Sequence, residues 1–175
     1  MRRAVFIDRD GVIVRNVKRE GFAVPTAPFL FSEFSFFPNV SEALRLLRSH
    51  GFLCILVTNQ PDVAYGHITR DEWEKIHDEV RKLPLDDVFV CMHTRCDNCE
   101  CKKPKPGMLF AAQRKWNIDL ARSFMVGDTD NDTIAGSAAG CATILVDAEY
   151  NREVKSDFRA ADFLEAARLV ISQND

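Results

Sequence analysis

Short apolar runs alternate along the chain with longer stretches in which apolar residues recur at helical spacing. Five runs are almost continuously apolar, which is typical of strands buried on both faces of a parallel sheet. They cover residues 4–7, 53–57, 88–91, 123–126 and 142–146. This alternation predicts repeated strand–helix units, and therefore an α/β fold in which helices cover both faces of a central parallel sheet.

The stretches between these runs carry signals for helix starts and stops. Asn39 or Ser41 can cap a helix for which Gly51 is the stop signal. Thr69 with Glu72 three residues later forms a capping box. The expected helices span about residues 40–50, 70–83, 107–116, 130–139 and 161–172.

Residues 12–37 break the alternation. They contain six phenylalanines and two prolines but no helical period, so we expect a flap or hairpin that follows the first strand. The chain of 175 residues has the length of one ordinary domain. We therefore expect a single domain over residues 1–175, without a large cap domain.

Charge and hydropathy narrow the classes of function. The net charge of −3 argues against nucleic-acid binding, which requires a basic excess, but permits a local basic pocket for a small anion. No apolar run approaches the roughly 18 residues that a membrane span requires. The amino terminus has no secretory signal pattern either. We expect a cytoplasmic monomer without nucleic-acid or membrane partners.

Polar residues with chemical potential stand where predicted strands end. Asp8, Thr58 and Asp128 each follow an apolar run, and ligands of parallel sheets bind at the carboxyl ends of the strands. Asp8 and Asp10 are two residues apart, so one carboxylate can attack a substrate while the other transfers a proton. Taken alone, this pair is better explained as a polar strand end.

Further segments bring phosphate-binding groups and acidic groups to the same edge. Thr58 and Asn59 offer a hydroxyl and backbone N–H groups to an oxyanion, and Lys103 offers a cation. Asp128 and Asp132 add carboxylates there. Converging carboxylates repel one another unless a hard cation lies between them, and Mg²⁺ prefers such oxygen ligands. The combination predicts a phosphate site with bound Mg²⁺.

The order of these segments resembles that of the haloacid-dehalogenase superfamily of phosphohydrolases. The matching segments are Asp8-Arg9-Asp10-Gly11-Val12, Thr58-Asn59-Gln60, Lys103-Pro104 and Gly127-Asp128-x-x-x-Asp132. The resemblance covers roughly residues 4–147. It implies a Rossmann-like three-layer sandwich around a central parallel sheet.

The resemblance also implies a mechanism. Asp8 would attack phosphorus and form an aspartyl-phosphate, while Asp10 would protonate the leaving alcohol and then activate water. Mg²⁺ would be held by the Asp8 carboxylate, the Asp10 backbone carbonyl and Asp128. Thr58 and Lys103 would hold the phosphoryl oxygens. Substrate contacts are expected from Arg9, Asn59, Gln60 and Lys102.

A cluster of soft ligands precedes Lys103. Cys91 with His93, and Cys99 with Cys101, supply four ligands at a spacing suited to tetrahedral Zn²⁺. Because four protein ligands fill such a site, the zinc would be structural. Cys96 is an additional thiol that could replace one of the four.

The segment 91–103 resembles the zinc loop of the histidinol-phosphate and heptose-bisphosphate phosphatases. The five residues between His93 and Cys99 match the histidinol-phosphate type. Segments 58–66 and 103–109 are closer to the heptose-bisphosphate type, although Tyr65 and Lys102 replace the usual arginines.

The resemblance and the cysteine cluster together imply three candidate functions. The first is a Mg²⁺-dependent phosphatase of D-glycero-D-manno-heptose 1,7-bisphosphate that releases the 7-phosphate, or of a related sugar phosphate. The alternative within the same chemistry is a histidinol-phosphate phosphatase. A third possibility is a zinc-loop interaction module without activity, and the intact set of Asp8, Asp10, Lys103 and Asp128 argues against it.

Overall fold

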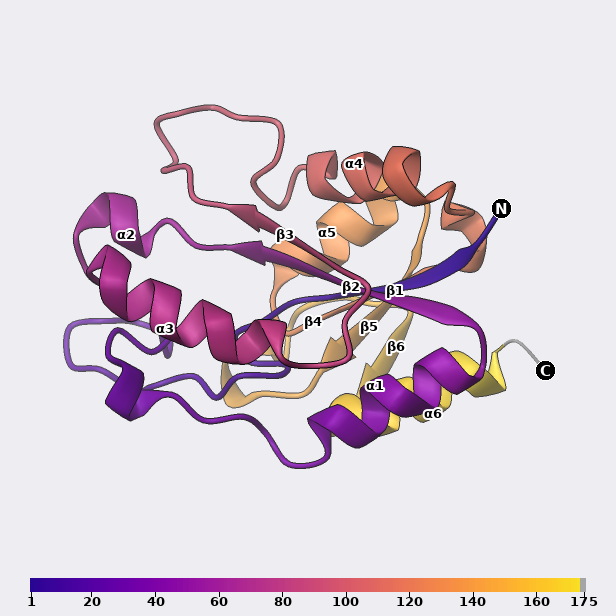
Figure 1. Ribbon diagram of the computed structural model, residues 1–175, viewed down its shortest axis with the longest axis horizontal. Coiled ribbons are helices and arrows are strands. Elements are labelled where there is room, and N and C mark those ends of the chain that lie inside the picture. The colour runs from indigo at the N-terminus through magenta and orange to yellow at the C-terminus, as the bar shows by residue number, and fades with distance from the viewer. Residues whose placement is uncertain (174–175) are drawn as a thin grey trace.

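The central sheet contains six strands in the order β3-β2-β1-β4-β5-β6, and every neighbouring pair is parallel. The computed structural model describes residues 1–173 (Figure 1). The strands are β1 (Arg3–Ile7), β2 (Phe52–Asn59), β3 (Asp87–Cys91), β4 (Phe124–Gly127), β5 (Ala142–Val146) and β6 (Phe158–Ala160). The sheet order places β1 between β2 and β4, so residues that follow these three strands meet near the middle of one edge.

Helices cover both faces of this sheet. They are α1 (Val40–Ser49), α2 (Asp62–Tyr65), α3 (Arg70–Arg81), α4 (Gly107–Trp116), α5 (Asp130–Ala139) and α6 (Phe163–Ser172). Figure 1 shows α4 and α5 on one side of the strands and α1 and α6 on the other. The predicted three-layer α/β fold without a large cap domain is therefore confirmed for the described residues.

Most of the core lies in two apolar clusters, one on each face of the sheet, and a third, smaller cluster contains Ile68, Trp73 and Ile76. In β1, Val5 and Ile7 pack in the cluster that includes α1 and α6, whereas Ala4 and Phe6 pack in the cluster that includes α4. Successive strand residues point to opposite faces. Burial on both faces explains why the strands appear in the sequence as continuous apolar runs.

Three elements differ from the sequence-based expectation, and one of them is the short helix α2 (Asp62–Tyr65), which none of the expected helices covers. β6 was not predicted, because it has only three residues and its central Arg159 is exposed. Asn39 precedes α1 in a left-handed conformation with φ of 62°, and its side chain makes no capping hydrogen bond. By contrast, Thr69 accepts a hydrogen bond from the backbone of Glu72, which is one half of the predicted capping box. The Glu72 carboxylate accepts from the Phe31 backbone and from Lys75 instead of completing the box.

The segment after β1 begins in the core and then reaches the surface. Residues 12–14 are buried, and further along Val17 and Thr26 pair in antiparallel fashion through two backbone hydrogen bonds of 2.8 and 2.9 Å. Figure 1 places this segment and the loop between β3 and α4 near the carboxyl ends of the strands. No helix within residues 1–173 is both long and apolar enough to cross a membrane.

Candidate active site

A cavity of about 450 Å³ opens at the carboxyl ends of the central strands. The Asp8 backbone N–H donates to the Val126 carbonyl at 2.9 Å, which fixes the end of β1 against β4. The cavity is lined by five of the residues predicted to form the site: Asp8, Asp10, Asn59, Lys103 and Asp128. Segments far apart in the sequence therefore supply one shared site.

Lys103 is the buried cation of this site. Its Nζ lies 2.9 Å from Asp8 Oδ1 and 2.6 Å from Asp132 Oδ1, and its side chain is 2% exposed. Burial alone lowers the pKa of Lys103, but the carboxylates of Asp132 and Asp8 outweigh burial and raise it. The ammonium group therefore stays charged at neutral pH.

Three carboxyl groups surround that cation. Asp8, Asp128 and Asp132 each have an oxygen within 4.8 Å of the others. Burial and the charge of Asp132 raise the pKa of Asp8 to about 7 although Lys103 lowers it. Burial and the charges of Asp132 and Asp8 likewise raise the pKa of Asp128 well above its ordinary value. The single positive charge of Lys103 is thus not enough to keep all three carboxyl groups ionised.

The donor set suits a hard divalent cation. Asp132 is already engaged, because its Oδ2 accepts hydrogen bonds of 3.0 and 2.6 Å from the backbone and hydroxyl of Thr129, and its Oδ1 accepts from Lys103. Asp8 and Asp128 are the carboxylates that remain for a metal. Mg²⁺ commonly uses one or two protein carboxylates and completes its shell with water and phosphate oxygens.

Asp128 is held in place from three directions. The Tyr150 hydroxyl donates to Asp128 Oδ2, and Asn16 Nδ2 lies 3.4 Å from the same oxygen. Asn151 Nδ2 donates to the Asp128 carbonyl at 2.8 Å. At Gly11, where φ is 81°, a Cβ atom would lie 1.9 Å from Asp128 Oδ2. Only glycine at position 11 leaves room for this carboxylate beside Asp8.

Asp10 is bound by two buried side chains. The guanidinium of Arg9 contacts it through Nε, at 3.1 Å from each carboxylate oxygen, and through Nη2, at 3.0 Å from Oδ2. Gln60 Nε2 lies 2.6 Å from Asp10 Oδ2 and 3.1 Å from Thr58 Oγ1. Arg9, Gln60 and Thr58 are 1%, 2% and 1% exposed, so they lie beneath Asp10 instead of facing solvent.

The side chain of Asn59 connects β2 to the loop that carries Lys103. Its Nδ2 donates to the Lys103 carbonyl at 2.9 Å, and its Oδ1 accepts from the Lys103 backbone N–H at 3.0 Å. This reciprocal pair fixes the backbone of the lysine directly at the end of the strand.

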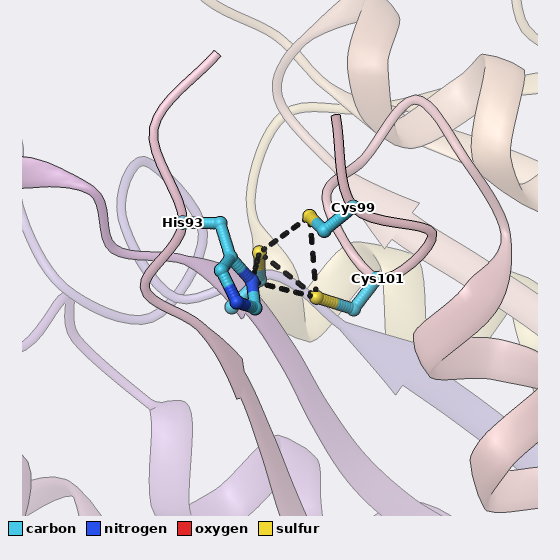
Figure 2. A group of neighbouring side chains, drawn as sticks. His93, Cys99 and Cys101 are labelled. Atoms are coloured by element: carbon cyan, nitrogen blue, oxygen red, sulfur yellow. Dashed lines mark hydrogen bonds between the residues drawn. The ribbon is translucent and has the colours of Figure 1, made fainter. Parts of the chain in front are cut away.

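The predicted zinc ligands form a compact cluster (Figure 2). Cys101 Sγ lies 3.2 Å from Cys91 Sγ and 3.4 Å from Cys99 Sγ, while Cys91 and Cys99 are 3.7 Å apart. His93 Nδ1 lies 3.2 Å from the Cys101 sulfur and 3.5 Å from that of Cys91. Cys96 is exposed and lies outside this cluster.

These spacings match a tetrahedral metal site better than a disulfide. Zinc–sulfur bonds of about 2.3 Å place two sulfurs about 3.8 Å apart, whereas a disulfide requires about 2.05 Å. Burial alone raises the pKa of Cys99, but hydrogen bonds from Cys101, Lys102 and Cys91 lower it to about 7. In the same cluster, burial and the neighbouring thiols raise the pKa of Cys101 to about 12. Without a metal the cluster therefore favours the thiolate, the form that binds zinc, at Cys99 and not at Cys101.

A second cavity of about 590 Å³ adjoins the first and shares Asn59, Lys103 and Asn131 with it. Its remaining wall comes largely from the zinc loop. Besides the shared Lys103, three cationic residues line it, namely Arg95, Lys102 and Lys105. The chain thus places a positively charged cavity next to the acidic one.

Some residues of the site carried no clear signal in the sequence. Asn16 lies in the irregular segment after β1, while Tyr150 and Asn151 belong to a short 3₁₀ turn after β5. Their position after a strand was the one available clue, because strand ends of a parallel sheet face the ligand site. The path of an irregular loop does not follow from periodicity.

Comparison with known proteins identifies relatives of the whole arrangement. The HAD-hydrolase-like family model matches residues 100–166. The D-glycero-beta-D-manno-heptose-1,7-bisphosphate 7-phosphatase of Pasteurella multocida is 36% identical over an alignment of 159 positions, and the match covers 83% of this chain and 82% of the relative. The D-glycero-alpha-D-manno-heptose-1,7-bisphosphate 7-phosphatase of Burkholderia mallei is 33% identical over 82% of this chain and 79% of its own.

A solved structure agrees with the fold. The D,D-heptose 1,7-bisphosphate phosphatase from B. bronchiseptica, complexed with magnesium and phosphate, superposes with a TM-score of 0.82. It is 28% identical in sequence, and the match covers 98% of this chain and 99% of that one. The likeness therefore extends over the sheet, both helical layers and the loops that line the two cavities.

Proposed function

The chain belongs to the haloacid-dehalogenase family of phosphatases, and from that premise we propose that it removes the 7-phosphate from a D-glycero-D-manno-heptose 1,7-bisphosphate. The phosphatase chemistry and the class of sugar-phosphate substrate come from the relatives. The single observation that carries the finer assignment is the pair of adjoining cavities, because a bisphosphate requires two anion-binding regions.

The acidic cavity would receive the phosphate that is removed. Lys103 provides a fixed positive charge beside Asp8, and in the metal-loaded enzyme the Asp8 and Asp128 carboxylates with the Asp10 backbone carbonyl would hold Mg²⁺. Bound there, Mg²⁺ supplies positive charge for the phosphoryl oxygens and lowers the pKa of Asp8. The second cavity, with Lys102, would receive the remaining phosphate.

The residues of the first cavity can carry out the reaction in two steps. An Asp8 oxygen attacks phosphorus, the bond from phosphorus to the sugar oxygen breaks, and Asp10 gives its proton to that oxygen. Asp10 then takes a proton from water, which attacks the aspartyl-phosphate and releases inorganic phosphate and free Asp8. Lys103, which lines the cavity, would stabilise the phosphoryl oxygens through both steps. The Thr58 hydroxyl, expected from the sequence to share this role, lies beneath Asp10 and accepts from Gln60 instead.

The zinc loop has a structural part in this proposal. Cys91, His93, Cys99 and Cys101 would hold Zn²⁺ with no open position for water. The metal would shape the wall of the basic cavity, where Lys102 donates to the His93 carbonyl at 3.0 Å. We also propose that residues 1–175 act as one domain and as a monomer, which light scattering of the purified protein would test.

The assignment is tested with a substrate panel. Phosphate release is measured with Mg²⁺ for both anomers of the heptose 1,7-bisphosphate, the heptose 7-phosphate, histidinol phosphate and p-nitrophenyl phosphate. We expect the highest kcat/KM with a bisphosphate and a higher KM for the 7-phosphate, which lacks the second anion. Asp8→Asn is the control, because it removes the nucleophile.

Two other results would redirect the assignment. Preference for histidinol phosphate would support the alternative suggested by the five residues between His93 and Cys99. Absence of turnover with every substrate, in protein that carries its zinc, would support a non-catalytic interaction module. Equal kcat/KM for the bisphosphate and the 7-phosphate would contradict the role of the basic cavity.

A further inference from the structure

We propose that Arg9 is a positioning residue for proton transfer, which aims Asp10 at the leaving oxygen and makes no contact with substrate. This inference replaces the expectation that Arg9 binds substrate. It rests on the phosphatase mechanism proposed above, in which Asp10 transfers the proton, but not on the identity of the sugar.

Arg9 is buried and, unlike Lys103, does not line the acidic cavity, which excludes it from direct recognition of the substrate. Its side chain is 1% exposed, which makes it one of the largest fully buried side chains of the protein. A buried guanidinium needs an anionic partner to offset the loss of hydration. Asp10 is the carboxylate that it contacts, and the carboxylate of Asp10 reaches the cavity that Arg9 does not line.

Arg9 touches both proposed catalytic carboxylates from different ends. Its backbone N–H donates to Asp8 Oδ1 at 2.7 Å, while its side chain binds Asp10. Its backbone carbonyl accepts hydrogen bonds of 2.9 Å from both Ile13 and Val14. The arginine is therefore anchored at its backbone by the turn after β1, and its planar side chain fixes the orientation of the Asp10 carboxylate.

The donors are shared unequally between the two oxygens of Asp10. Oδ2 receives Arg9 Nε, Arg9 Nη2 and Gln60 Nε2, whereas Oδ1 receives only Arg9 Nε. A carboxylate oxygen has about two lone-pair sites. Oδ2 is thus saturated with donors and Oδ1 retains free capacity, so the geometry assigns Oδ1 as the oxygen that carries the transferred proton.

A leaving-group comparison separates this role from a purely structural one. A sugar alkoxide needs a proton as it leaves, whereas p-nitrophenolate leaves without one. The ratio kcat/KM includes the steps up to loss of the alcohol, so it reports this proton transfer. Since general acid catalysis contributes about 10²–10⁴-fold, we expect Arg9→Met to lower kcat/KM about 10–100-fold for the best alkyl phosphate.

For p-nitrophenyl phosphate the same variant should lose less than about threefold in kcat/KM, because no acid is required. Arg9→Lys keeps the buried charge but cannot bind both oxygens in one plane, so it should fall between wild type and Arg9→Met. Arg45→Met, on the exposed face of α1, is the matched control and should behave as wild type. Circular dichroism and zinc content show whether each variant is folded.

A double-mutant cycle with Asp10→Asn completes the test. If Arg9 acts through Asp10, Arg9→Met has no further effect on alkyl phosphate turnover in the Asp10→Asn background. A raised KM at unchanged kcat, an equal loss for both leaving groups in Arg9→Lys, or additive effects in the cycle would each overturn the inference. The comparison uses whichever alkyl phosphate the wild type hydrolyses, so a wrong sugar assignment does not affect it.

Discussion

Replacing Asp8 with asparagine is expected to stabilise the Mg²⁺-free protein at pH 8, and to stabilise it less as the pH falls. Burial, followed by the charge of Asp132, raises the pKa of Asp8 from 3.8 to about 7 even though Lys103 opposes the shift. The folded state therefore binds this proton more tightly than the unfolded state does. Asp8 contributes its full stability below about pH 4, and that contribution is lost as the pH rises to about 7.

The size of the effect follows from the two pKa values. A rise from 3.8 to about 7 corresponds to about 4 kcal/mol in the free energy of unfolding, of which roughly half is lost between pH 5 and pH 8. Asparagine has no charge to bury. The difference in unfolding free energy between Asp8→Asn and wild type should therefore grow by about 2–3 kcal/mol over this range.

Urea unfolding of both proteins at several pH values between 5 and 8 measures this difference. Mg²⁺ is removed by gel filtration, because a chelator would also remove zinc. Carboxyl groups far from Asp8 titrate alike in both proteins, so their contributions cancel. Asp128 is the exception, because the Asp8 charge that raises its pKa is absent from the variant, and the measured difference includes this change. Added Mg²⁺ should stabilise wild type most at high pH and leave Asp8→Asn almost unchanged. A difference that stays constant from pH 5 to pH 8, or a variant less stable than wild type at pH 8, would refute the reasoning.

Three further outcomes are expected. Wild type should contain one zinc per chain by elemental analysis, and the double change Cys99→Ser with Cys101→Ser should abolish zinc binding; retained zinc would contradict the assigned ligands. Lys103→Met should lower kcat by about 10²–10³, because charge neutralisation is greatest in the transition state. Lys102→Met should instead raise KM with kcat within about threefold of wild type, and steady-state kinetics that reverse this order would exchange the two roles. Tyr150→Phe should weaken Mg²⁺ binding about tenfold in titration calorimetry without loss of zinc, because the hydroxyl that orients Asp128 is removed; unchanged affinity would show that Tyr150 is dispensable for the metal.

The sheet was largely predictable because burial on both faces leaves a strong pattern. The runs that form β1 to β5 are apolar for most of their length. Such a continuous run identifies a strand without any need to decide which residues point to which face of the sheet. β6 has no such run, because it is short, lies at the edge of the sheet and exposes Arg159. An edge strand of this kind is defined by pairing with β5, which local sequence does not encode.

The site was predictable only where strands or ligand spacing define positions. Asp8 and Asp128 follow buried strands, and the spacing of Cys99 and Cys101 indicates a metal cluster whatever the path of the loop. Arg9 was different, because a charged residue between two catalytic carboxylates suggests contact with substrate. The turn closed by Gly11, with φ of 81°, directs its side chain into the protein, and that direction depends on tertiary packing.

The two hydrogen bonds between the Asn59 side chain and the backbone of Lys103 make the position of this lysine independent of the shape of the loop before it. They involve only main-chain atoms of the lysine, so they do not depend on which side chains occupy residues 92–102. The end of the loop that carries Lys103 is bonded to the end of β2 through Asn59. The conformation of residues 92–102, which form the wall of the basic cavity, depends instead on the metal cluster. Mutations can therefore alter that wall and admit new molecules while the ammonium group keeps its place. Such a scaffold can diversify its substrates in small steps, each of which passes through a working phosphatase.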